Sequence, residues 1–526
     1  MAVEEFDYII IGSGFGGSVS ALRLSEKGYR VLVLEKGKNY SAQDFPKTNW
    51  NVRKYLWIPI IKCFGIQKMT LFRDVLILSG VGVGGGSLVY ANTLLQPTDE
   101  FFKAKSWADL DHWKSALEPH YQTAKKMLGV AKNPYLNAVD KELLKVAQET
   151  GREHTFKSVD VAVYFSEKGL EEKIVPDPYF NGEGPERAGC NFCGGCMVGC
   201  RFNAKNTLDK NYLYLAQKKN CVVKAEREVV DIRPLSENGE NGYEVHAVRS
   251  TSWFLKDKQI YKAKGIVLAG GVLGSVALLF RLRDITKSLP KISQRLGFDV
   301  RTNSEALIGV TTKNSNEDWS KGIAIASGFY PDEHTHVEAV RYSVGSSFMR
   351  FLAVPMVDLT DGVPRFFQFL YRVFRHPTET FFLIKNRRWS QSTVILLVMQ
   401  SLDNKMKIVR RWSGLSTDRT SEEIVPSYIP AGHKVARHLA QNTNGIPQSA
   451  VNEVLLQIPT TAHILGGCGI GATSASGVID RNQKLFNYKN FYVCDGSAIP
   501  ANLGVNPSLT ITAMTEYAMS KIPKKI

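Results

Sequence analysis

Two polar residues near the C-terminus are suited to the oxidation of an alcohol. His463 lies in the segment Thr-Ala-His-Ile-Leu-Gly-Gly-Cys, and Asn506 lies in Gly-Val-Asn-Pro. Removal of a hydride from an alcohol carbon requires the hydroxyl group to lose its proton, and histidine has an ordinary pKa close to neutrality. Taken alone, a histidine is usually structural, and an asparagine before proline is an ordinary turn residue. The pair indicates oxidation only if a hydride acceptor lies beside it.

The N-terminus carries a dinucleotide-binding pattern. Gly12, Gly14 and Gly17 form G-x-G-x-x-G between a predicted strand at residues 8–11 and a predicted helix at residues 18–27. In this pattern the first glycine permits a tight turn, the second lets the backbone approach a pyrophosphate, and the third lets the helix pack closely. Glu35 closes the next predicted strand, where its carboxylate can accept hydrogen bonds from ribose hydroxyls. NAD and FAD both fit this fingerprint.

A second glycine-rich stretch, residues 79–92, favours a flavin. It holds five glycines within seven positions, so its backbone can lie directly against a flat ring and phosphates. A flexible hinge is the alternative. Apolar, strand-like residues on both sides of the stretch argue for an ordered, buried loop, and therefore for FAD.

Four cysteines form a compact run. Cys190, Cys193, Cys196 and Cys200 have the spacing of bacterial ferredoxin ligands, although no proline follows the last one and no second run exists. The alternatives are a [4Fe-4S] or related iron-sulfur cluster, a zinc site, which usually separates its cysteine pairs by a longer loop, and thiols without a ligand. The remaining cysteines are predicted to lie in the core: Cys63, Cys221, Cys468 and Cys494.

These segments together resemble the glucose-methanol-choline (GMC) oxidoreductases, and within them the cholesterol oxidase branch, in an intracellular type that carries the cysteine run. The resemblance spans nearly the whole chain and implies a hydride transfer to FAD. It implies that His463 is the catalytic base and that Asn506 orients the substrate oxygen beside the flavin. It further implies that Glu338 moves a proton when a steroid ring double bond shifts.

The same resemblance assigns cofactor contacts. Residues 79–92 match the loop that covers the flavin, Asp495 matches the residue at the ribityl-phosphate region, and Val229 or Val230 matches the backbone contact to adenine. The implied FAD-binding set is Gly12, Gly14, Gly17, Glu35, Gly84, Gly85, Ser87, Asn92, Val230, Asp495, Gly496 and Asn506.

The chain of 526 residues is long enough for two or more domains. We predict an α/β fold with a Rossmann-like FAD-binding domain of the GMC type and a mixed α+β substrate-binding domain. The FAD-binding domain comprises residues 1–300, with an insertion at 99–188 and the cysteine run at 190–200, and residues 456–526. The substrate-binding domain comprises residues 301–455. We also predict that strands at 221–224 and 229–232 pair with each other.

Charge and apolar patterning bear on partners and location. The formal net charge is +16, but no basic, aromatic-interleaved recognition motif appears, so no nucleic-acid partner is expected. The acidic start of the chain does not resemble an export signal, and we expect a cytoplasmic protein. Three apolar stretches with basic edges are candidates for peripheral contact with a membrane surface, the alternative being core helix: residues 54–62, 366–375 and 381–389.

The predicted function is FAD-dependent oxidation of the CH-OH group of a hydrophobic alcohol. A 3β-hydroxysteroid of the cholesterol type is the first candidate, with a Δ5-Δ4 isomerisation as a further step, and either O2 or an electron carrier as the acceptor. One alternative is a membrane-associated non-steroid alcohol dehydrogenase that passes electrons through the cluster. A second alternative, from another class, is a flavin-holding electron-transfer or sensor protein.

Overall fold

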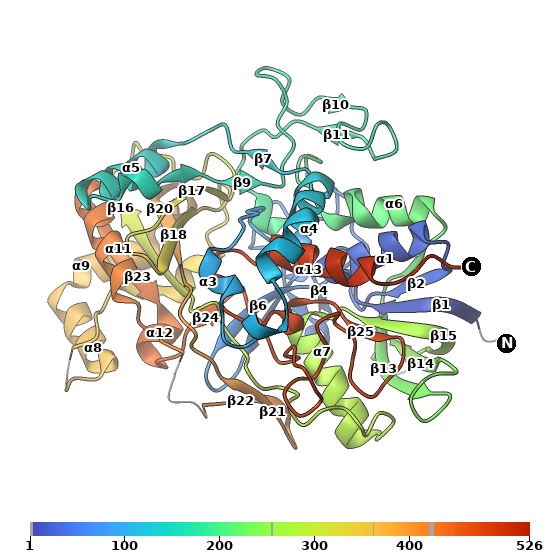
Figure 1. Cartoon of the computed structure of the whole chain (residues 1–526). Helices are drawn as coiled ribbons and strands as arrows, with labels where there is room; N and C mark the ends of the chain where they lie inside the picture. The colour runs from blue at the N-terminus through green and yellow to red at the C-terminus, as the bar shows by residue number, and fades with distance from the viewer. Residues whose placement is uncertain (1–3, 254–255, 361, 420–424) are drawn as a thin grey trace.

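The first sheet is built around the predicted βαβ unit (Figure 1). The computed structural model describes residues 4–253, 256–360, 362–419 and 425–526. Strand β1 (Glu4–Ile11) lies between β2 (Val31–Leu34) and β15 (Lys258–Leu268), parallel to both. Helix α1 (Phe15–Glu26) connects β1 to β2. Every residue of β2 is buried, as expected of a strand with both faces covered.

The rest of this sheet comes from distant parts of the chain. Its order is β12-β2-β1-β15-β14-β13, and β25 (Phe491–Val493) adds a parallel strand to β15. The outer strands are β12 (Val222–Lys224), β13 (Arg227–Pro234) and β14 (Tyr243–Arg249). The predicted pairing of 221–224 with 229–232 is therefore wrong, because β12 pairs with β2 and β13 pairs with β14, at opposite edges of the sheet.

Helices from both ends of the chain cover this sheet. Helix α13 (Ser508–Ser520) packs on α1 and on α4 (Trp113–Met127), and α6 (Tyr212–Lys218) also packs on α1. Figure 1 shows these helices on one side of the sheet and α7 (Gly271–Phe280) on the other. The arrangement confirms an α/β fold of the Rossmann-like kind and brings the C-terminus beside the N-terminal turn.

The second sheet is antiparallel and has the order β19-β23-β16-β20-β18-β17-β8. Helices α5 (Ala138–Glu149) and α11 (Pro430–Asn442) pack against it. Its strands are β8 (Lys157–Ser158), β16 (Ala306–Thr312), β17 (Ile325–Phe329), β18 (Thr335–Val340), β19 (Ala353–Pro355), β20 (Thr393–Gln400) and β23 (Gly445–Ala450).

The predicted insertion at 99–188 contributes to both halves of the fold. Helix α4 is one of the helices that cover the first sheet, α5 packs against the second sheet, and β8 is a strand of the second sheet. The division into residues 1–300, 301–455 and 456–526 stays a prediction. Further short elements are α2 (Val52–Tyr55), β3 (Trp57–Ile58), β4 (Cys63–Phe64), β5 (Gln67–Leu71), β6 (Leu76–Gly80), α3 (Asp99–Phe102), β7 (Ala131–Lys132), β9 (Asp160–Val161), β10 (Ile174–Val175), β11 (Arg187–Ala188), α10 (Trp389–Ser392), β21 (Lys407–Arg411), β22 (Gly414–Asp418), α12 (Val451–Leu455) and β24 (Thr460–Thr461).

Two helices present apolar side chains to solvent. They are α8 (Arg365–Arg375) and α9 (Pro377–Lys385), at the far end of the second sheet in Figure 1. Arg365 is buried and donates hydrogen bonds to the carbonyls of Val357, Ser427 and Glu453, so the start of α8 is fastened to the fold. Exposed aromatic and aliphatic residues on the pair are Phe366, Phe367, Tyr371, Phe374, Phe381 and Ile384. Across the described ranges, no helix is both long and apolar enough to cross a bilayer.

Candidate active site

A cavity of about 920 Å³ joins the predicted cofactor residues to the predicted catalytic pair. Its walls come from both ends of the chain and from the second sheet. The predicted residues that line it are Gly12, Gly14, Glu35, Gly85, Val230, His463, Asp495, Gly496 and Asn506. Other predicted residues stand behind this lining: Gly17, Gly84, Ser87, Asn92 and Glu338.

The glycine turn has the steric properties that the sequence pattern predicts. Gly12 has φ of +98°, and a Cβ atom there would lie 2.3 Å from the carbonyl oxygen of Ala269. A Cβ atom on Gly17 would lie 2.0 Å from the carbonyl oxygen of Gly12, so α1 packs on the turn at a distance that only glycine permits. An added Cβ on Gly14 meets no atom within 4 Å. That open side is where a pyrophosphate is expected.

The glycine-rich loop lies directly on this turn. A Cβ atom on Gly85 would lie 2.6 Å from the Cα atom of Gly14, so the backbones of the loop and the turn are in direct contact and leave no room for a side chain at position 85. Gly84 has φ of +103°, in the left-handed region. The hydroxyl of Ser87 donates to the carbonyl of Gly84 (2.7 Å) and accepts from the N-H of Leu208 (3.1 Å). Gly84 and Ser87 therefore fix the loop from behind the cavity.

Glu35 lines the cavity but is partly engaged by the protein. Its carboxylate accepts hydrogen bonds from the N-H of Ser13 (3.0 Å), the hydroxyl of Ser13 (2.8 Å) and the N-H of Gly37 (2.8 Å). These contacts hold the carboxylate at the end of β2, beside the glycine turn. Ribose binding by Glu35 stays a prediction.

Val230 lies at a β-bulge in strand β13. The register of β13 against β14 shifts between Val229 and Asp231, so Val230 is the extra residue of the bulge. Its carbonyl accepts from Nε of Arg281 at 2.7 Å. The bulge supports the predicted backbone contact to adenine and favours Val230 over Val229.

Asp495 follows β25 and is anchored between two serines. Its carboxylate accepts from the hydroxyl of Ser275 and from the N-H of Ser497 (2.8 Å). Burial raises the pKa of Asp495, and these hydrogen bonds oppose the rise. Gly496 lies next to it in the cavity lining.

The residues fit FAD, on three observations. The open face of Gly14 leaves room for a phosphate, the cavity is continuous from the glycine turn to His463, and the side-chain oxygen of Asn506 is buried without a hydrogen-bond partner among the described residues. A buried acceptor without a partner is costly and points to a missing donor. Gly12, Gly14, Gly85, Asp495 and Gly496 line the cavity, and their binding of the cofactor stays a prediction.

His463 is positioned by a carboxylate that the sequence did not single out. Nδ1 of His463 lies 3.2 Å from Oε2 of Glu305, which precedes β16 and is fully buried. Glu305 also accepts from the hydroxyl of Thr461 (2.8 Å) and the N-H of Ala462 (3.1 Å). Burial lowers the pKa of His463, but the Glu305 carboxylate raises it more, and the net pKa lies above the ordinary 6.5.

Asn506 connects this site to a second buried carboxylate. Its side-chain N-H donates to Oε2 of Glu338 at 3.2 Å. Burial raises the pKa of Glu338 to about 7, while the hydrogen bond from Asn506 opposes the rise. His336 lies 3.8 Å from the same carboxyl group, and burial lowers its pKa to about 3, so this histidine stays neutral. The predicted catalytic residues His463, Asn506 and Glu338 are thus brought together.

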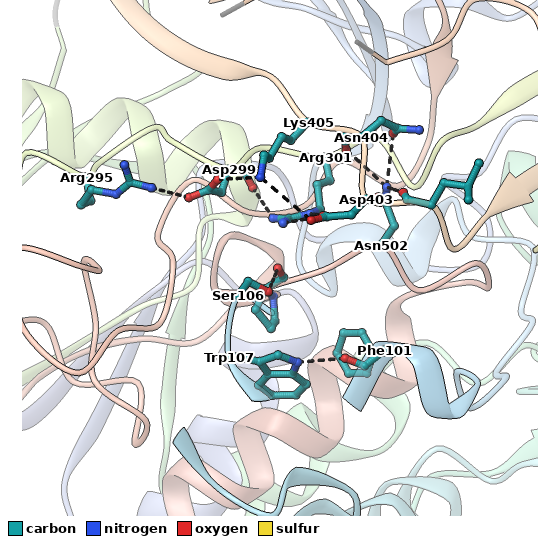
Figure 2. Close-up of polar contacts among 12 residues, drawn as sticks. Phe101, Ser106, Trp107, Arg295, Asp299, Arg301, Asp403, Asn404, Lys405 and Asn502 are labelled. Atoms are coloured by element: carbon teal, nitrogen blue, oxygen red, sulfur yellow. Dashed lines mark hydrogen bonds and ion pairs between the residues drawn. The ribbon is translucent and has the colours of Figure 1, made fainter. Parts of the chain in front are cut away.

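The loop before Asn506 is held by residues that flank two strands of the second sheet. Asn303 precedes β16, and Leu402 follows β20. The Asn303 side chain donates to the carbonyl of Val505 (3.0 Å) and accepts from the N-H groups of Leu503 and Gly504 (2.9 Å each). Figure 2 shows the neighbouring anchor, in which Asn502 donates to the carbonyl of Leu402 (2.6 Å).

An ion pair beside this anchor fixes the same region. Figure 2 shows the guanidinium of Arg301 against Asp403 (2.7 Å), with a further hydrogen bond to the carbonyl of Asp299. On the other side of the loop, the hydroxyl of Ser106 donates to the carbonyl of Pro500 at 2.7 Å. Asn506 is therefore placed by contacts with three separate parts of the chain.

A set of apolar side chains also lines the cavity. They come from strands of the second sheet, from the segment 342–349 and from the cysteine run. They are Met197, Leu307, Ile325, Val340, Tyr342, Met349, Ile395 and Leu397. This part of the cavity suits the body of a hydrophobic substrate.

The four cysteines of the run line a second, smaller cavity. All eight cysteines are free thiols, and Cys63, Cys221, Cys468 and Cys494 are buried, as predicted. Burial, and then the Cys196 thiolate, raise the pKa of Cys193 to about 11. Within the residues that the structure describes, no three His, Cys, Asp or Glu side chains are grouped to hold a metal ion.

Comparison with known proteins places this site in a family. The family models described as GMC oxidoreductase match residues 6–296 and 404–515. A cholesterol oxidase of Acinetobacter baumannii is 46% identical over 99% of this chain and 95% of its own, and one of Mycobacterium tuberculosis H37Rv is 44% identical over 99% and 92%. The crystal structure of pyridoxine 4-oxidase from Mesorbium loti superposes with a TM-score of 0.63 at 14% identity, over 98% of this chain and 99% of that one. The chain belongs to the GMC oxidoreductase family of FAD-dependent enzymes that act on CH-OH groups.

Proposed function

We propose that this protein oxidises the secondary alcohol of a hydrophobic molecule of the 3β-hydroxysteroid type. The observation that carries the proposal is a single cavity lined by His463, Asn506, the predicted cofactor residues and a set of apolar side chains. Two relatives at 44 and 46% identity are named cholesterol oxidases, which supports a sterol-like substrate.

His463 and Asn506 have different roles in the oxidation of the alcohol. FAD, when bound, accepts the hydride. Nδ1 of His463 is directed to Glu305, which leaves Nε2 as the nitrogen that accepts the hydroxyl proton once the imidazole is neutral. The amide of Asn506 holds the substrate oxygen and is itself held by Glu338. Exclusion of water by the apolar side chains strengthens these polar interactions.

A second proposed step is the isomerisation of a ring double bond by Glu338. Its pKa of about 7 means that both the acid and the carboxylate are populated near neutrality, as a group that takes up and returns a proton requires. Glu338 is fully buried behind Asn506, so this role depends on access past the amide.

The acceptor, the location and the membrane contact are also proposals. The name oxidase of the relatives supports O2 as acceptor, and the cysteine run supports a carrier instead. Free thiols throughout the chain favour a reducing, cytoplasmic setting. The exposed aromatic face of α8 and α9, bordered by Arg372, Arg375 and Lys385, suits the surface of an anionic membrane.

Anaerobic mixing tests the function directly. The purified yellow protein is mixed with 3β-hydroxysterols and with long-chain alcohols, and bleaching of the flavin absorbance is followed. We expect bleaching by sterols. Bleaching by long-chain alcohols alone would favour the non-steroid dehydrogenase, and an oxidised flavin with every alcohol would favour a flavin protein without turnover.

His463→Ala separates catalysis from cofactor binding in the same assay. We expect the yellow colour to remain and the rate of bleaching to fall by about 10²- to 10⁴-fold, which is the usual contribution of a general base. An unchanged rate would remove His463 from the mechanism.

A further inference from the structure

Two buried groups without a partner face each other on strand β18. Nδ1 of His336 lies 3.8 Å from Oε1 of Glu338. The side chain of His336 is 4% exposed, and that of Glu338 is fully buried. Within the part of the chain that the structure describes, neither atom has a hydrogen-bond partner. An unpaired buried polar atom is costly, so two complementary ones at this separation indicate an interaction between them.

Strand geometry places both side chains on the face of β18 that leads to the active site. Residues 336, 338 and 340 share this face, because successive side chains of a strand point to opposite faces. Val340 lines the cavity, and Glu338 lies behind Asn506. Ala339, on the opposite face, belongs to the core under α5 and α11. His336 therefore follows Glu338 along the strand, one step farther from the cavity.

The imidazole of His336 is held in place by the end of strand β17. The ring of Tyr330 stacks on it, with 4.5 Å between the centroids and 21° between the planes. Tyr330 is fixed through its backbone, because its N-H donates to the hydroxyl of Thr155 (3.0 Å) and its carbonyl accepts from Nε of Arg152 (3.0 Å). A Cβ atom on Gly328 would lie 2.8 Å from Nε2 of the imidazole, so a side chain there would displace the ring.

The gap between His336 and Glu338 is too short for a water molecule. A water that bridged the two atoms would hold them roughly 4.5 Å apart or more, since each of its hydrogen bonds is about 2.8 Å long. A direct hydrogen bond requires the carboxyl group to approach the imidazole by roughly 1 Å. The terminal torsion of a glutamate side chain has a broad energy minimum, so a small rotation supplies this movement.

The chemistry of the pair allows one hydrogen bond in each protonation state. Oε2 of Glu338 accepts from Asn506, which leaves Oε1 as the oxygen that carries the acid proton. The acid donates from Oε1 to Nδ1 of a neutral imidazole whose own proton is on Nε2, whereas the carboxylate accepts from Nδ1-H. Between these states the acid proton moves from Oε1 to Nδ1, and the proton on Nε2 is released. Burial lowers the pKa of His336 to about 3 and raises that of Glu338 to about 7, so both states are populated near neutrality.

Other titratable groups near Glu338 do not supply this partner. The charge of His463 lowers the pKa of Glu338, and the charge of Glu305 raises it. Tyr330 is close enough for the charge of Glu338 to raise its own pKa. Among the described residues, Oε1 of Glu338 has no hydrogen bond to any of these three. The imidazole of His336 is the group placed to take this role.

We propose that His336 is the hydrogen-bond partner of Glu338 and changes tautomer each time Glu338 gains or loses its proton. Because His336 lies outside the cavity lining, it is a positioning residue. Its contact leaves Oε2 of Glu338 to Asn506 in both states, so the amide in the cavity keeps its orientation while Glu338 carries a proton. The benefit to catalysis rests on the proposed isomerisation, in which Glu338 takes a proton from one ring carbon and returns it to another.

Nuclear magnetic resonance of the histidine ring nitrogens tests the pair without any substrate. The holoenzyme with ¹⁵N-labelled histidine is titrated from pH 5 to 9, and the chemical shifts show which ring nitrogen carries the proton. We expect one histidine to move its proton from Nε2 to Nδ1 as the pH rises through about 7, without forming an imidazolium. A His336 whose proton stays on one nitrogen over this range would overturn the proposal.

Three variants assign the signal. His336→Asn should remove it, whereas His334→Asn, at an exposed histidine two positions earlier, is the control and should leave the switch unchanged. Glu338→Gln places an amide where the acid stands, and its N-H should keep the imidazole proton on Nε2 at every pH. A switch that persists in Glu338→Gln would assign it to another group and overturn the pairing. FAD content and thermal melting show which variants are folded.

His336→Phe separates the hydrogen bond from the packing, because a phenyl ring still stacks on Tyr330 but has no nitrogen. A hydrogen bond to a charged group is stronger than one to a neutral group, so its loss should raise the pKa of Glu338 by about one unit. The acidic limb of the pH profile of isomerisation should move up equally, and less in His336→Asn, which keeps an amide near the position of Nδ1. An unshifted profile in His336→Phe would leave His336 a structural role alone. A tautomer switch without isomerisation of any sterol would contradict the proposed isomerisation and leave the pair intact.

Discussion

Nδ1 of His463 lies 3.2 Å from Oε2 of Glu305, and the Glu305 carboxylate is fully buried. The two residues are 158 positions apart in the chain and meet because β24 pairs with β6 while β16 runs alongside. The carboxylate orients the imidazole and stabilises its protonated form. It is therefore a positioning residue for the proposed base.

The Glu305 contact predicts how the pH dependence of alcohol oxidation changes on mutation. Only neutral His463 accepts a proton, so the rate should rise with pH through its raised pKa. Glu305→Gln removes the charge that raises this pKa, and the acidic limb should move to lower pH. Glu305→Asp, which keeps the charge, should shift it less. The measurement is the rate of flavin reduction from pH 5 to 9, and superimposable profiles would contradict the assignment.

Asn506 is predicted to act on the substrate and not on the fold. Asn506→Ala removes the amide that lines the cavity, and we expect the rate of flavin reduction to fall by about 10²- to 10³-fold, as for the loss of a preorganised donor. FAD content should stay unchanged. Asn442→Ala, at the end of α11, where the half-buried side chain donates to Glu149, is the control and should keep the wild-type rate. Equal losses in both variants would indicate a general structural effect.

Glu338 is predicted to separate isomerisation from oxidation. With a pKa of about 7, its carboxylate form declines as pH falls below neutrality, so proton abstraction from a ring carbon should weaken at acidic pH. In Glu338→Gln, chromatography should detect the oxidised, unshifted ketone, formed at a rate within a few-fold of wild type. A shifted enone made at the wild-type rate by this variant would exclude Glu338 from that step.

Alanine substitutions at Gly17 and Gly14, in the same turn, are predicted to affect different properties: the stability of the apoprotein and the binding of FAD. A Cβ on Gly17 would meet the carbonyl of Gly12, so Gly17→Ala should lower the free energy of unfolding of the apoprotein by about 1–3 kcal/mol, a typical cost of overpacking. A Cβ on Gly14 meets open space, so Gly14→Ala should leave apoprotein stability unchanged and weaken FAD binding. Denaturation of the apoproteins and FAD titration measure the two effects. Tight FAD binding by Gly14→Ala would place the pyrophosphate elsewhere.

The aromatic face of α8 is predicted to bind anionic lipid. The wild-type protein should co-sediment with vesicles that contain phosphatidylglycerol, and the double variant Phe367→Ser, Phe374→Ser should bind more weakly, because both side chains are more than half exposed. Ile174→Ser, which removes an exposed apolar side chain from the distant strand β10, is the control. Equal binding by all three proteins would show that the aromatic face of α8 does not bind the lipid.

The glycine turn was predictable because a short sequence pattern records it. The steric demand on Gly17 comes from Gly12 in the same turn, whereas the demand on Gly12 comes from Ala269, which only the fold brings beside it. Asn506 and Asp495 were found only through a resemblance, since their partners, Glu338 and Ser275, lie far away in the sequence.

Pairing between strands that lie far apart in the chain could not be predicted from the sequence. The strand at 222–224 pairs with β2, whose residues lie 190 positions earlier, whereas its short spacing from 227–234 favoured a hairpin. Glu305 was missed for a related reason. A single glutamate before an apolar strand has no local signature, and only the fold reveals that it faces a histidine.

Strand β25 joins the first sheet beside β15 late in the sequence, and Asp495 and Asn506 follow it. A nascent chain still lacking these residues has the glycine turn and the apolar side chains of the second sheet, but it lacks Asp495, Gly496 and the amide of Asn506. The cavity that joins the glycine turn to His463 is therefore completed only when the last residues of the chain have been added.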